Sequence, residues 1–211
     1  GTWKIQASQA KSIVEKALQV GYRHYDTAAA YANENDIGEA IAQADVAREA
    51  LLISAKLWTS KRSYDAAIKA CRRSLKNLQL TYFDQYLIHW PAVPALYANW
   101  QEMNTETWHA LETLKQDGLV HSIGLCNFRP HHIDALLQHA NIKPSVNQIE
   151  YHPGYNQPET VEYCKKNDIK LEAWSPLGNG LLLTHPMLQK IADDHNISVA
   201  QVCIRWCIQH D

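Results

Sequence analysis

The sequence predicts an α/β fold in which strands and helices alternate along the whole chain, of the (β/α)8 or TIM-barrel type. Six short apolar runs of strand length are separated by stretches long enough for helices, a pattern typical of a parallel sheet. Neither a G-x-G-x-x-G string after the first strand nor a P-loop occurs, so an open doubly wound sheet would lack its usual phosphate-binding device. Several runs end in a polar, reactive side chain, which is where a barrel places its active site.

The first half of the chain alternates regularly. Residues 8–20 have the apolar spacing of an amphipathic helix, which Ser8 can cap and Gly21 can close. The run LLISAKL at 51–57 is nearly continuous in apolar residues, as expected of a strand buried on both faces. The other elements expected here are strands at 22–26 and 83–89, helices at 34–44 and 64–78, and a proline-bounded loop at 91–103.

The second half continues the alternation without a linker or a low-complexity segment. One domain is therefore expected over residues 1–211. Because six strands leave a barrel two short, we place the end of strand one at residues 1–3 and strand eight after Asp211, which makes the chain a barrel truncated at both ends. The elements expected are helices at 106–116, 130–139, 158–167, 186–194 and 198–209, strands at 120–125, 145–151 and 170–174, and a loop at 175–183.

The composition is that of an ordinary globular enzyme. The chain has 211 residues, of which 46% are hydrophobic and 20% charged, with a formal net charge of -2. This balance gives no reason to expect a nucleic-acid partner or an anionic membrane surface, and the basic cluster at 69–76 is interpreted as the solvated face of a helix. No apolar run is long enough to span a membrane and no signal peptide is evident, so we expect a cytoplasmic protein.

The cysteines and histidines indicate no metal site. The five cysteines are an odd number without C-x-x-C spacing, so no disulfide framework is expected. Cys203 and Cys207 are four residues apart on a predicted helix; a metal pair would suit that spacing, but two core thiols are the preferred interpretation.

Four polar side chains stand at or just after the ends of predicted strands. Asp26 ends one strand and Tyr31 follows it in the loop, while Lys56 and His89 end the next two. Alone, Asp26 could cap a turn, Tyr31 could be a packing residue and His89 a core histidine. Lys56 is harder to explain as structure, because a buried ammonium needs a partner. Together, at the carboxyl ends of successive parallel strands, the four indicate an active site.

Six motifs follow one another along the chain: DTAAAY (26–31), LLISAKLW with its lysine (51–58), YLIHWP (86–91), GLVHSIGLCNF (118–128), SVNQIEYHP (145–153) and EAWSPLG (172–178). In this order, and over essentially the whole chain, they resemble the aldo/keto reductase family. Trp174 stands where many members have Tyr. A Trp at this position is similar to the branch of the family that reduces small aldehydes and 2,5-diketo-gluconate.

The resemblance implies reduction of aldehydes and ketones to alcohols, with a catalytic tetrad of Asp26, Tyr31, Lys56 and His89. A hydride would come from the nicotinamide, and Tyr31 would donate the proton to the developing alkoxide. We expect Lys56 to lower the pKa of Tyr31 from its reference value of about 10, and Asp26 to keep Lys56 charged. His89 would hydrogen-bond the carbonyl oxygen and orient it.

The resemblance also implies the residues that contact the nicotinamide. Asn127 and Gln148 occupy the positions that hydrogen-bond its carboxamide, and Trp174 occupies the position of the ring that stacks under it. Cys126 stands where most members have Ser. Because a thiol is a weak donor, one cofactor contact is expected to be lost or reassigned.

The loop after Trp174 is implied to approach the pyrophosphate through its backbone N–H groups, at Ser175, Leu177 and Gly178. Without the resemblance, this loop would be interpreted as a plain flexible connection. NADPH is the expected cofactor because it is what the resemblance implies. NAD is the alternative, because the family selects between the two with residues that follow strand eight, which we place after Asp211.

Three tryptophans, Trp3, Trp58 and Trp90, flank the catalytic strand ends and are expected to line the substrate pocket, with core packing as the alternative. The expected partner is a small carbonyl compound such as an aldehyde, a dicarbonyl or a diketo sugar acid, and the expected state is a monomer. The alternative from another class is a non-catalytic, nucleotide-sensing binding subunit of the same fold. A phosphate-binding isomerase barrel is disfavoured because no phosphate loop is evident.

Overall fold

The computed structural model describes residues 1–210, which divide into two compact units. Unit 1 comprises residues 1–126 and 131–145, and unit 2 comprises residues 127–130 and those from 146 onward. Each unit is an α/β structure with its own parallel strands. None of the helices in residues 1–210 combines the length and the hydropathy that crossing a bilayer requires.

Four parallel strands form the sheet of unit 1, and they pair in the order in which they occur along the chain. This arrangement brings the carboxyl ends of successive strands to one edge, because each connection returns the chain to the same starting edge. In the register, Asp26 lies opposite Ser54, and Lys56 lies opposite Leu87. The strands are β1 (His24–Asp26), β2 (Leu52–Leu57), β3 (Phe83–Ile88) and β4 (Val120–Cys126).

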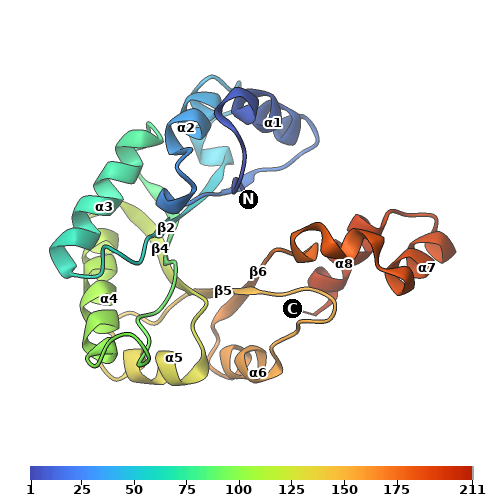
Figure 1. Cartoon of the computed structure of the whole chain (residues 1–211). Helices are drawn as coiled ribbons and strands as arrows, with labels where there is room; N and C mark the ends of the chain where they lie inside the picture. Colours follow the sequence, from blue (N-terminus) through green and yellow to red (C-terminus); the bar gives the residue numbers. More distant parts are fainter. Residues whose placement is uncertain (211) are drawn as a thin grey trace. The chain divides into compact units, whose positions relative to one another are not determined.

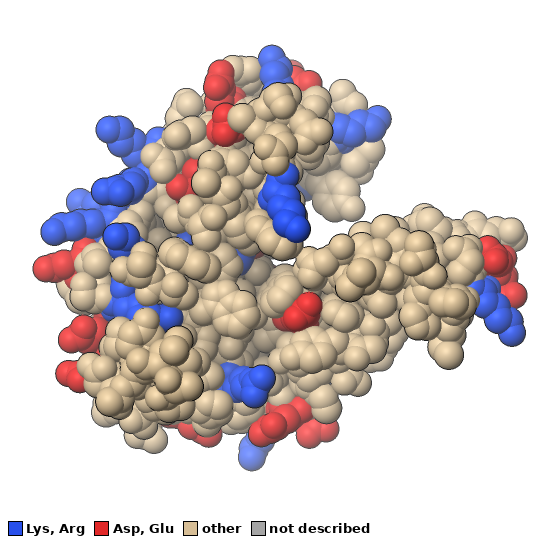
Figure 2. All heavy atoms as spheres, in the orientation of Figure 1, with Lys and Arg blue, Asp and Glu red and all other residues tan. Residues whose placement is uncertain are grey.

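Helices cover one face of this sheet, with α2, α3 and α4 side by side along it (Figure 1). Ile53, Ala55 and Leu57 alternate along β2 and are fully buried, as expected for apolar side chains on a single face. The elements are α1 (Ala7–Gln19), α2 (Glu34–Ala42), α3 (Tyr64–Asn77), α4 (Trp100–Gln116) and α5 (Pro130–Leu137), with 3-10 turns η1 (Ala29–Tyr31) and η2 (Arg48–Ala50). Basic side chains project over the outer surface of α3 (Figure 2), as predicted for residues 69–76.

The opposite face of strands β1 to β3 is buried but polar. His24 Nε2 and Ser54 Oγ are 2.7 Å apart, and the Ser54 hydroxyl donates to Gln85 Oε1 at 2.7 Å. Asp26 and Lys56 follow two residues later on the same face, since side chains alternate along a strand. The prediction that β2 is buried on both faces is confirmed, and its second face carries the polar groups of the site.

Unit 2 contains the last two strands, which are parallel and aligned so that Gln148 lies opposite Glu172. Helices α7 and α8 pack together through a small apolar cluster of Leu188, Ala192 and Cys203. The elements are β5 (Val146–Glu150), α6 (Pro158–Lys166), β6 (Lys170–Trp174), the 3-10 segment η3 (Gly178–Thr184), α7 (Pro186–His195) and α8 (Val199–Gln209). All six predicted strands are therefore present among the described residues.

Several expected boundaries were wrong. Helix α1 begins at Ala7 after Gln6, so Ser8 lies inside the first turn and does not cap it. Helix α4 begins at Trp100 and not at 106, where the expected loop extended to 103. Residues 1–3 form no strand, although Thr2 N–H donates to the Asp26 carbonyl at 2.9 Å. The expected loop at 175–183 is largely 3-10 helical.

Candidate active site

The four predicted catalytic side chains all lie in unit 1 and meet at the carboxyl edge of its sheet. Asp26 is the last residue of β1, Lys56 is next to last in β2, and His89 follows the end of β3. Tyr31 ends the 3-10 turn η1, which begins three residues after Asp26. Contiguous parallel strands thus bring together groups that are up to 63 positions apart in sequence, from 26 to 89.

Lys56 is the centre of the group. Its side chain is 1% exposed, and its Nζ donates to Asp26 Oδ2 at 2.5 Å, to Tyr31 Oη at 3.3 Å and to the Thr27 carbonyl at 3.3 Å. Burial lowers the pKa of Lys56, but the charge of Asp26 and the phenol of Tyr31 act against it and leave that pKa above its ordinary value. Lys56 is therefore a cation at neutral pH.

Tyr31 lies against this cation, with Lys56 Nζ 5.3 Å from the centre of its ring. Burial is the largest influence on the pKa of Tyr31 and, with the charge of Asp26, raises it above its ordinary value although Lys56 lowers it, so the phenol keeps its proton at neutral pH. Lys56 lowers the pKa of Tyr31, as expected. Burial of the phenolate and the negative charge of Asp26 together outweigh the lysine, so the pKa of Tyr31 stays above its ordinary value.

His89 completes the group as a neutral imidazole. Burial, together with the nearby charge of Lys56, lowers its pKa from 6.5 to about 4. Tyr31 and Trp58 both meet its ring edge to face, with ring centres 5.8 and 5.2 Å away. A neutral histidine beside a protonated tyrosine can present hydrogen-bond donors to an oxygen that becomes negative, and the tyrosine can also give up its proton.

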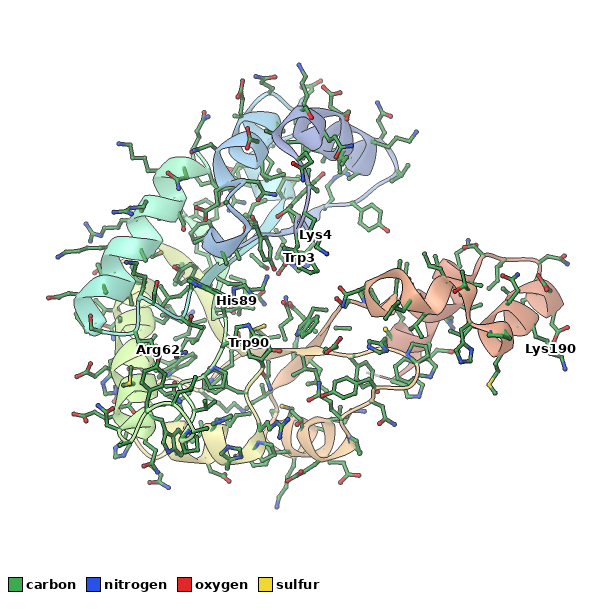
Figure 3. The ribbon with its side chains drawn as sticks, viewed as in Figure 1. Trp3, Lys4, Arg62, His89, Trp90 and Lys190 are labelled. Carbon is green, nitrogen blue, oxygen red and sulfur yellow. The ribbon has the colours of Figure 1, made fainter. Side chains whose placement is uncertain are left out.

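The three predicted pocket tryptophans are partly exposed, at 53% for Trp3, 39% for Trp58 and 43% for Trp90. The alternative of core packing is therefore excluded for them. Trp58 contacts the ring of His89. Lys4 Nζ lies over the ring of Trp3, 4.2 Å from its centre. Figure 3 shows Trp3 and Trp90 with His89 in the same part of unit 1.

In unit 2, the predicted nicotinamide residues form a hydrogen-bonded group. Asn127 adopts a positive φ of 65° and its backbone N–H donates to the Gln148 carbonyl at 2.9 Å. The indole N–H of Trp174 donates to Asn127 Oδ1 at 2.9 Å. Gln148 Nε2 donates to Glu172 Oε2 at 3.0 Å. Two carboxamides, one just after β4 and one within β5, are thus gathered with the indole at the end of β6.

The predicted pyrophosphate loop follows directly. Ser175 has a positive φ of 50°, and Gly178 has one of 55° and donates its N–H to the Ser175 carbonyl at 2.8 Å. A Cβ built on Gly178 would lie 2.9 Å from Leu182 Cγ, so this position has neither the backbone freedom nor the space for a side chain. Leu177 packs its side chain against the apolar cluster of α7 and α8.

Two groups of the site escaped the sequence analysis. The Thr27 carbonyl accepts from Lys56, and a backbone acceptor leaves no mark in the residue pattern. Glu172 accepts from Gln148, and its spacing of two from Trp174 on β6 could have indicated that both occupy one face.

No group of three or more metal-ligating side chains exists among the described residues. All five cysteines are free. Cys203 is a core thiol, as predicted, whereas Cys207 is half-buried and donates its thiol to the Tyr151 carbonyl.

Comparisons with known proteins identify the family of the chain. The chain matches the family described as "Aldo/keto reductase family" over residues 1–211. It is 46% identical to glyoxal reductase of Bacillus subtilis (strain 168), covering 100% of this chain and 74% of that protein. It is 41% identical to 9,11-endoperoxide prostaglandin H2 reductase of Trypanosoma cruzi (strain CL Brener), covering 100% of this chain and 73% of that protein.

Two solved structures show the same fold. An aldo/keto reductase from Brucella melitensis is 43% identical with a TM-score of 0.90, over 99% of this chain and 78% of that one. The aldose reductase from Schistosoma japonicum is 38% identical with a TM-score of 0.90, over 99% of this chain and 74% of that one. The predicted barrel-type α/β fold is confirmed by this likeness.

Proposed function

The chain belongs to the aldo/keto reductase family of oxidoreductases, and from that premise we propose that it reduces a small aldehyde or ketone to the alcohol with NADPH and with Tyr31 as the proton donor. The observation that carries the proposal is the position of Lys56 Nζ, buried and charged, 2.5 Å from Asp26 and 3.3 Å from the Tyr31 hydroxyl. A buried cation placed between a carboxylate and a phenol is difficult to explain as a structural device.

Proton donation follows from the charges around Tyr31. The phenol keeps its proton at neutral pH, so the proton is available when a substrate oxygen becomes negative. At 3.3 Å and an effective dielectric constant near 20, the Lys56 cation stabilises a tyrosinate by about 5 kcal/mol. Lys56 therefore stabilises the negative charge that forms on the Tyr31 oxygen as its proton leaves.

His89 is proposed to orient the carbonyl group. Because its pKa is about 4, the imidazole is neutral at physiological pH and donates one N–H without competing with Tyr31 as an acid. A second donor at the carbonyl oxygen favours the geometry in which the carbon accepts a hydride and the oxygen accepts the Tyr31 proton.

The residues of unit 2 fit a nicotinamide nucleotide. Asn127 and Gln148 supply carboxamides, which pair with another carboxamide through one donor and one acceptor each, and Trp174 supplies an indole ring beside them. When bound, NADPH supplies the hydride. We propose that Ser175, Leu177 and Gly178 hold its pyrophosphate by their backbone, and that NADPH is used in preference to NADH.

The substrate is proposed to be a small aldehyde or dicarbonyl compound, bordered by Trp3, Trp58 and Trp90. The similarity to a protein named glyoxal reductase supports this class. Five free cysteines are compatible with the reducing environment of the cytoplasm, where we place the protein as a monomer that binds neither nucleic acid nor a membrane.

The test is consumption of NADPH by the full chain, followed by nucleotide absorbance, with glyoxal, methylglyoxal, other small aldehydes and a diketo sugar acid. Tyr31→Phe is expected to lose roughly 10²- to 10⁴-fold in kcat, the contribution of a positioned acid, while nucleotide affinity stays within about twofold. Nucleotide binding without turnover of any carbonyl compound would favour the nucleotide-sensing alternative. A Tyr31→Phe variant with more than about a tenth of wild-type kcat would remove Tyr31 from the acid role.

A further inference from the structure

The segment that carries His89 and Trp90 leaves the sheet at the end of β3. The His89 N–H donates to the Leu57 carbonyl at 3.1 Å, which is the last hydrogen bond that β2 and β3 share. Strand β3 ends at Ile88, so from Trp90 onward the backbone needs other partners.

Arg62 supplies the first two of these partners. Its Nη1 donates to the Trp90 carbonyl at 3.1 Å and its Nη2 donates to the Pro91 carbonyl at 3.1 Å. The residue is only 9% exposed, and its guanidinium lies 5.7 Å from the ring centre of Tyr97. The backbone of Arg62 is itself anchored, because its carbonyl accepts the hydroxyl of Thr107 on α4.

Asn104 holds the next residue of the same segment. Its Oδ1 accepts the Ala92 N–H at 2.7 Å and its Nδ2 donates to the Ala92 carbonyl at 3.1 Å. Asn104 lies on α4 and is buried, and Ala92, in the segment that follows β3, is buried as well. Three successive residues after His89 are thus bound by two buried side chains, in a region where Figure 3 shows Arg62, Trp90 and His89 near one another.

The choice of an arginine at this position is costly. Burial of Arg62 lowers its pKa, and no ion pair with Asp or Glu is found for it in residues 1–210. A buried charge without an opposite charge costs free energy, and Asn104 shows that a neutral amide can bind a backbone residue on both sides. What a guanidinium adds is a rigid fork that reaches two successive carbonyls at once.

We propose that Arg62 is a positioning residue of the reaction, which fixes the backbone after His89 so that the imidazole and the Trp90 ring stay aligned with the substrate. This inference rests on the proposed function, since alignment matters only if His89 orients a carbonyl group. Catalytic side chains must be held within about 0.5 Å of their working geometry. A displacement of about 1 Å can cost roughly 10²-fold in rate.

Arg48, in the 3-10 turn η2 before β2, provides a matched control. Its guanidinium also donates to two backbone carbonyls, of Leu51 and Tyr82 at 3.0 Å each, and stacks 4.0 Å from the Tyr82 ring. It lies at the amino end of β3, opposite to the tetrad, and forms an ion pair with Asp84 at 2.7 Å. Arg48→Met therefore removes a similar pair of backbone contacts, together with the ion pair to Asp84, and should lower the melting temperature at unchanged kcat.

The experiment compares Arg62→Met, Arg62→Lys and Arg48→Met in the full chain, alone and with His89→Gln. Arg62→Met should lose about 10- to 100-fold in kcat with nucleotide affinity within about twofold, and Arg62→Lys should recover part of the loss. In the His89→Gln background, Arg62→Met should cost less than about twofold more, because residues that act as a unit are not additive.

Two results would overturn the inference while leaving the proposed function intact: a kcat for Arg62→Met within about twofold of wild type, or an equal loss with and without His89. If the wild-type chain has no turnover, the proposed function fails, and amide hydrogen exchange then decides about Arg62 independently. Arg62→Met should speed exchange in residues 89–97 by about tenfold or more, and Arg48→Met should not. Unchanged exchange in this segment would refute the proposal that Arg62 fixes the backbone after His89.

Discussion

Asp26→Asn tests most directly the proposed charge relay, in which Asp26 keeps Lys56 charged and Lys56 stabilises the tyrosinate of Tyr31. The amide keeps the shape of the carboxylate but removes its charge from beside Lys56 Nζ, 2.5 Å away in a site where the lysine is almost completely buried. At this distance and an effective dielectric constant near 20, the lost attraction is about 7 kcal/mol. Breaking a buried ion pair in proteins typically costs about 3–5 kcal/mol, the remainder being recovered by relaxation.

The expected consequence is a lysine that no longer stays charged. With Asp26 gone, burial is the largest influence on Lys56 and drives its pKa downward instead of upward. A neutral lysine no longer provides Tyr31 with its cation, whose interaction with a tyrosinate is about 5 kcal/mol. We expect kcat to fall by about 10²- to 10³-fold, within the range of a positioned acid, with little change in nucleotide affinity.

Lys56→Met and the double substitution complete the cycle. Lys56→Met removes the cation outright, so the double variant should be scarcely slower than Lys56→Met alone. The double variant should also be more stable than Asp26→Asn, because it no longer buries an amine that has lost its carboxylate partner. The assay is kcat at saturating substrate for the three variants, with nucleotide affinity from fluorescence and stability from thermal unfolding. Fully additive losses in kcat, or a double variant less stable than Asp26→Asn, would refute the relay.

Three further predictions concern other parts of the chain. The pKa of His89 is 6.5 when exposed and about 4 in the folded chain, so only the unfolded chain gains this proton as pH falls between these values. Roughly 3 kcal/mol of folding stability should be lost over that range. Urea unfolding near pH 7 and near pH 4 measures the loss, and His89→Gln should remove it. Gly178→Ala should destabilise the chain by about 1–3 kcal/mol and weaken nucleotide binding, since φ is positive and Leu182 lies in the way; unchanged binding by fluorescence titration would separate this loop from the cofactor. Glu112→Ala should cost about 2–4 kcal/mol in thermal unfolding at unchanged kcat, because the carboxylate accepts three hydrogen bonds from the loop at Asn141, far along α4 from the tetrad.

Strand ends were the most predictable part of the site. Lys56 and His89 follow apolar runs whose length is typical of buried strands, so their place at the carboxyl edge follows from the alternation of strands and helices alone. Tyr31 was located in the correct loop, but the 3-10 turn that presents it was not expected. That turn ends at Ala32 in the left-handed region, with φ of 57°, a conformation that alanine rarely adopts and that tertiary contacts must impose.

Burial, in contrast, could not be judged from the order of residues. The net pKa of Tyr31 depends on how much protein surrounds the phenol, and this outweighs the lysine that the sequence correctly placed beside it. The start of α4 at Trp100 was missed for a related reason, because Asn104 in the early part of this helix is held by hydrogen bonds to Ala92, a contact that the order of residues does not show. Arg62 gave no signal at all, since its role depends on carbonyl groups, which every residue has.

The nicotinamide residues were identified by resemblance. Asn127, Gln148 and Trp174 do lie together in unit 2, in hydrogen-bonded contact through side chains and backbone. Their contacts with a nucleotide stay predictions, as does the consequence of Cys126 in place of a serine.

The tetrad is drawn from three consecutive strands and one short turn, all within residues 26–89. A ribosome adds about 5–20 residues per second from the amino end, so all four side chains are synthesised before Asn127 exists. Pairing of strands that are neighbours in sequence closes shorter loops than pairing of strands farther apart along the chain, which costs less entropy. During translation the charges of Asp26 and Lys56 can therefore be paired before Asn127 and Gln148, the residues proposed to bind the nucleotide, have been synthesised.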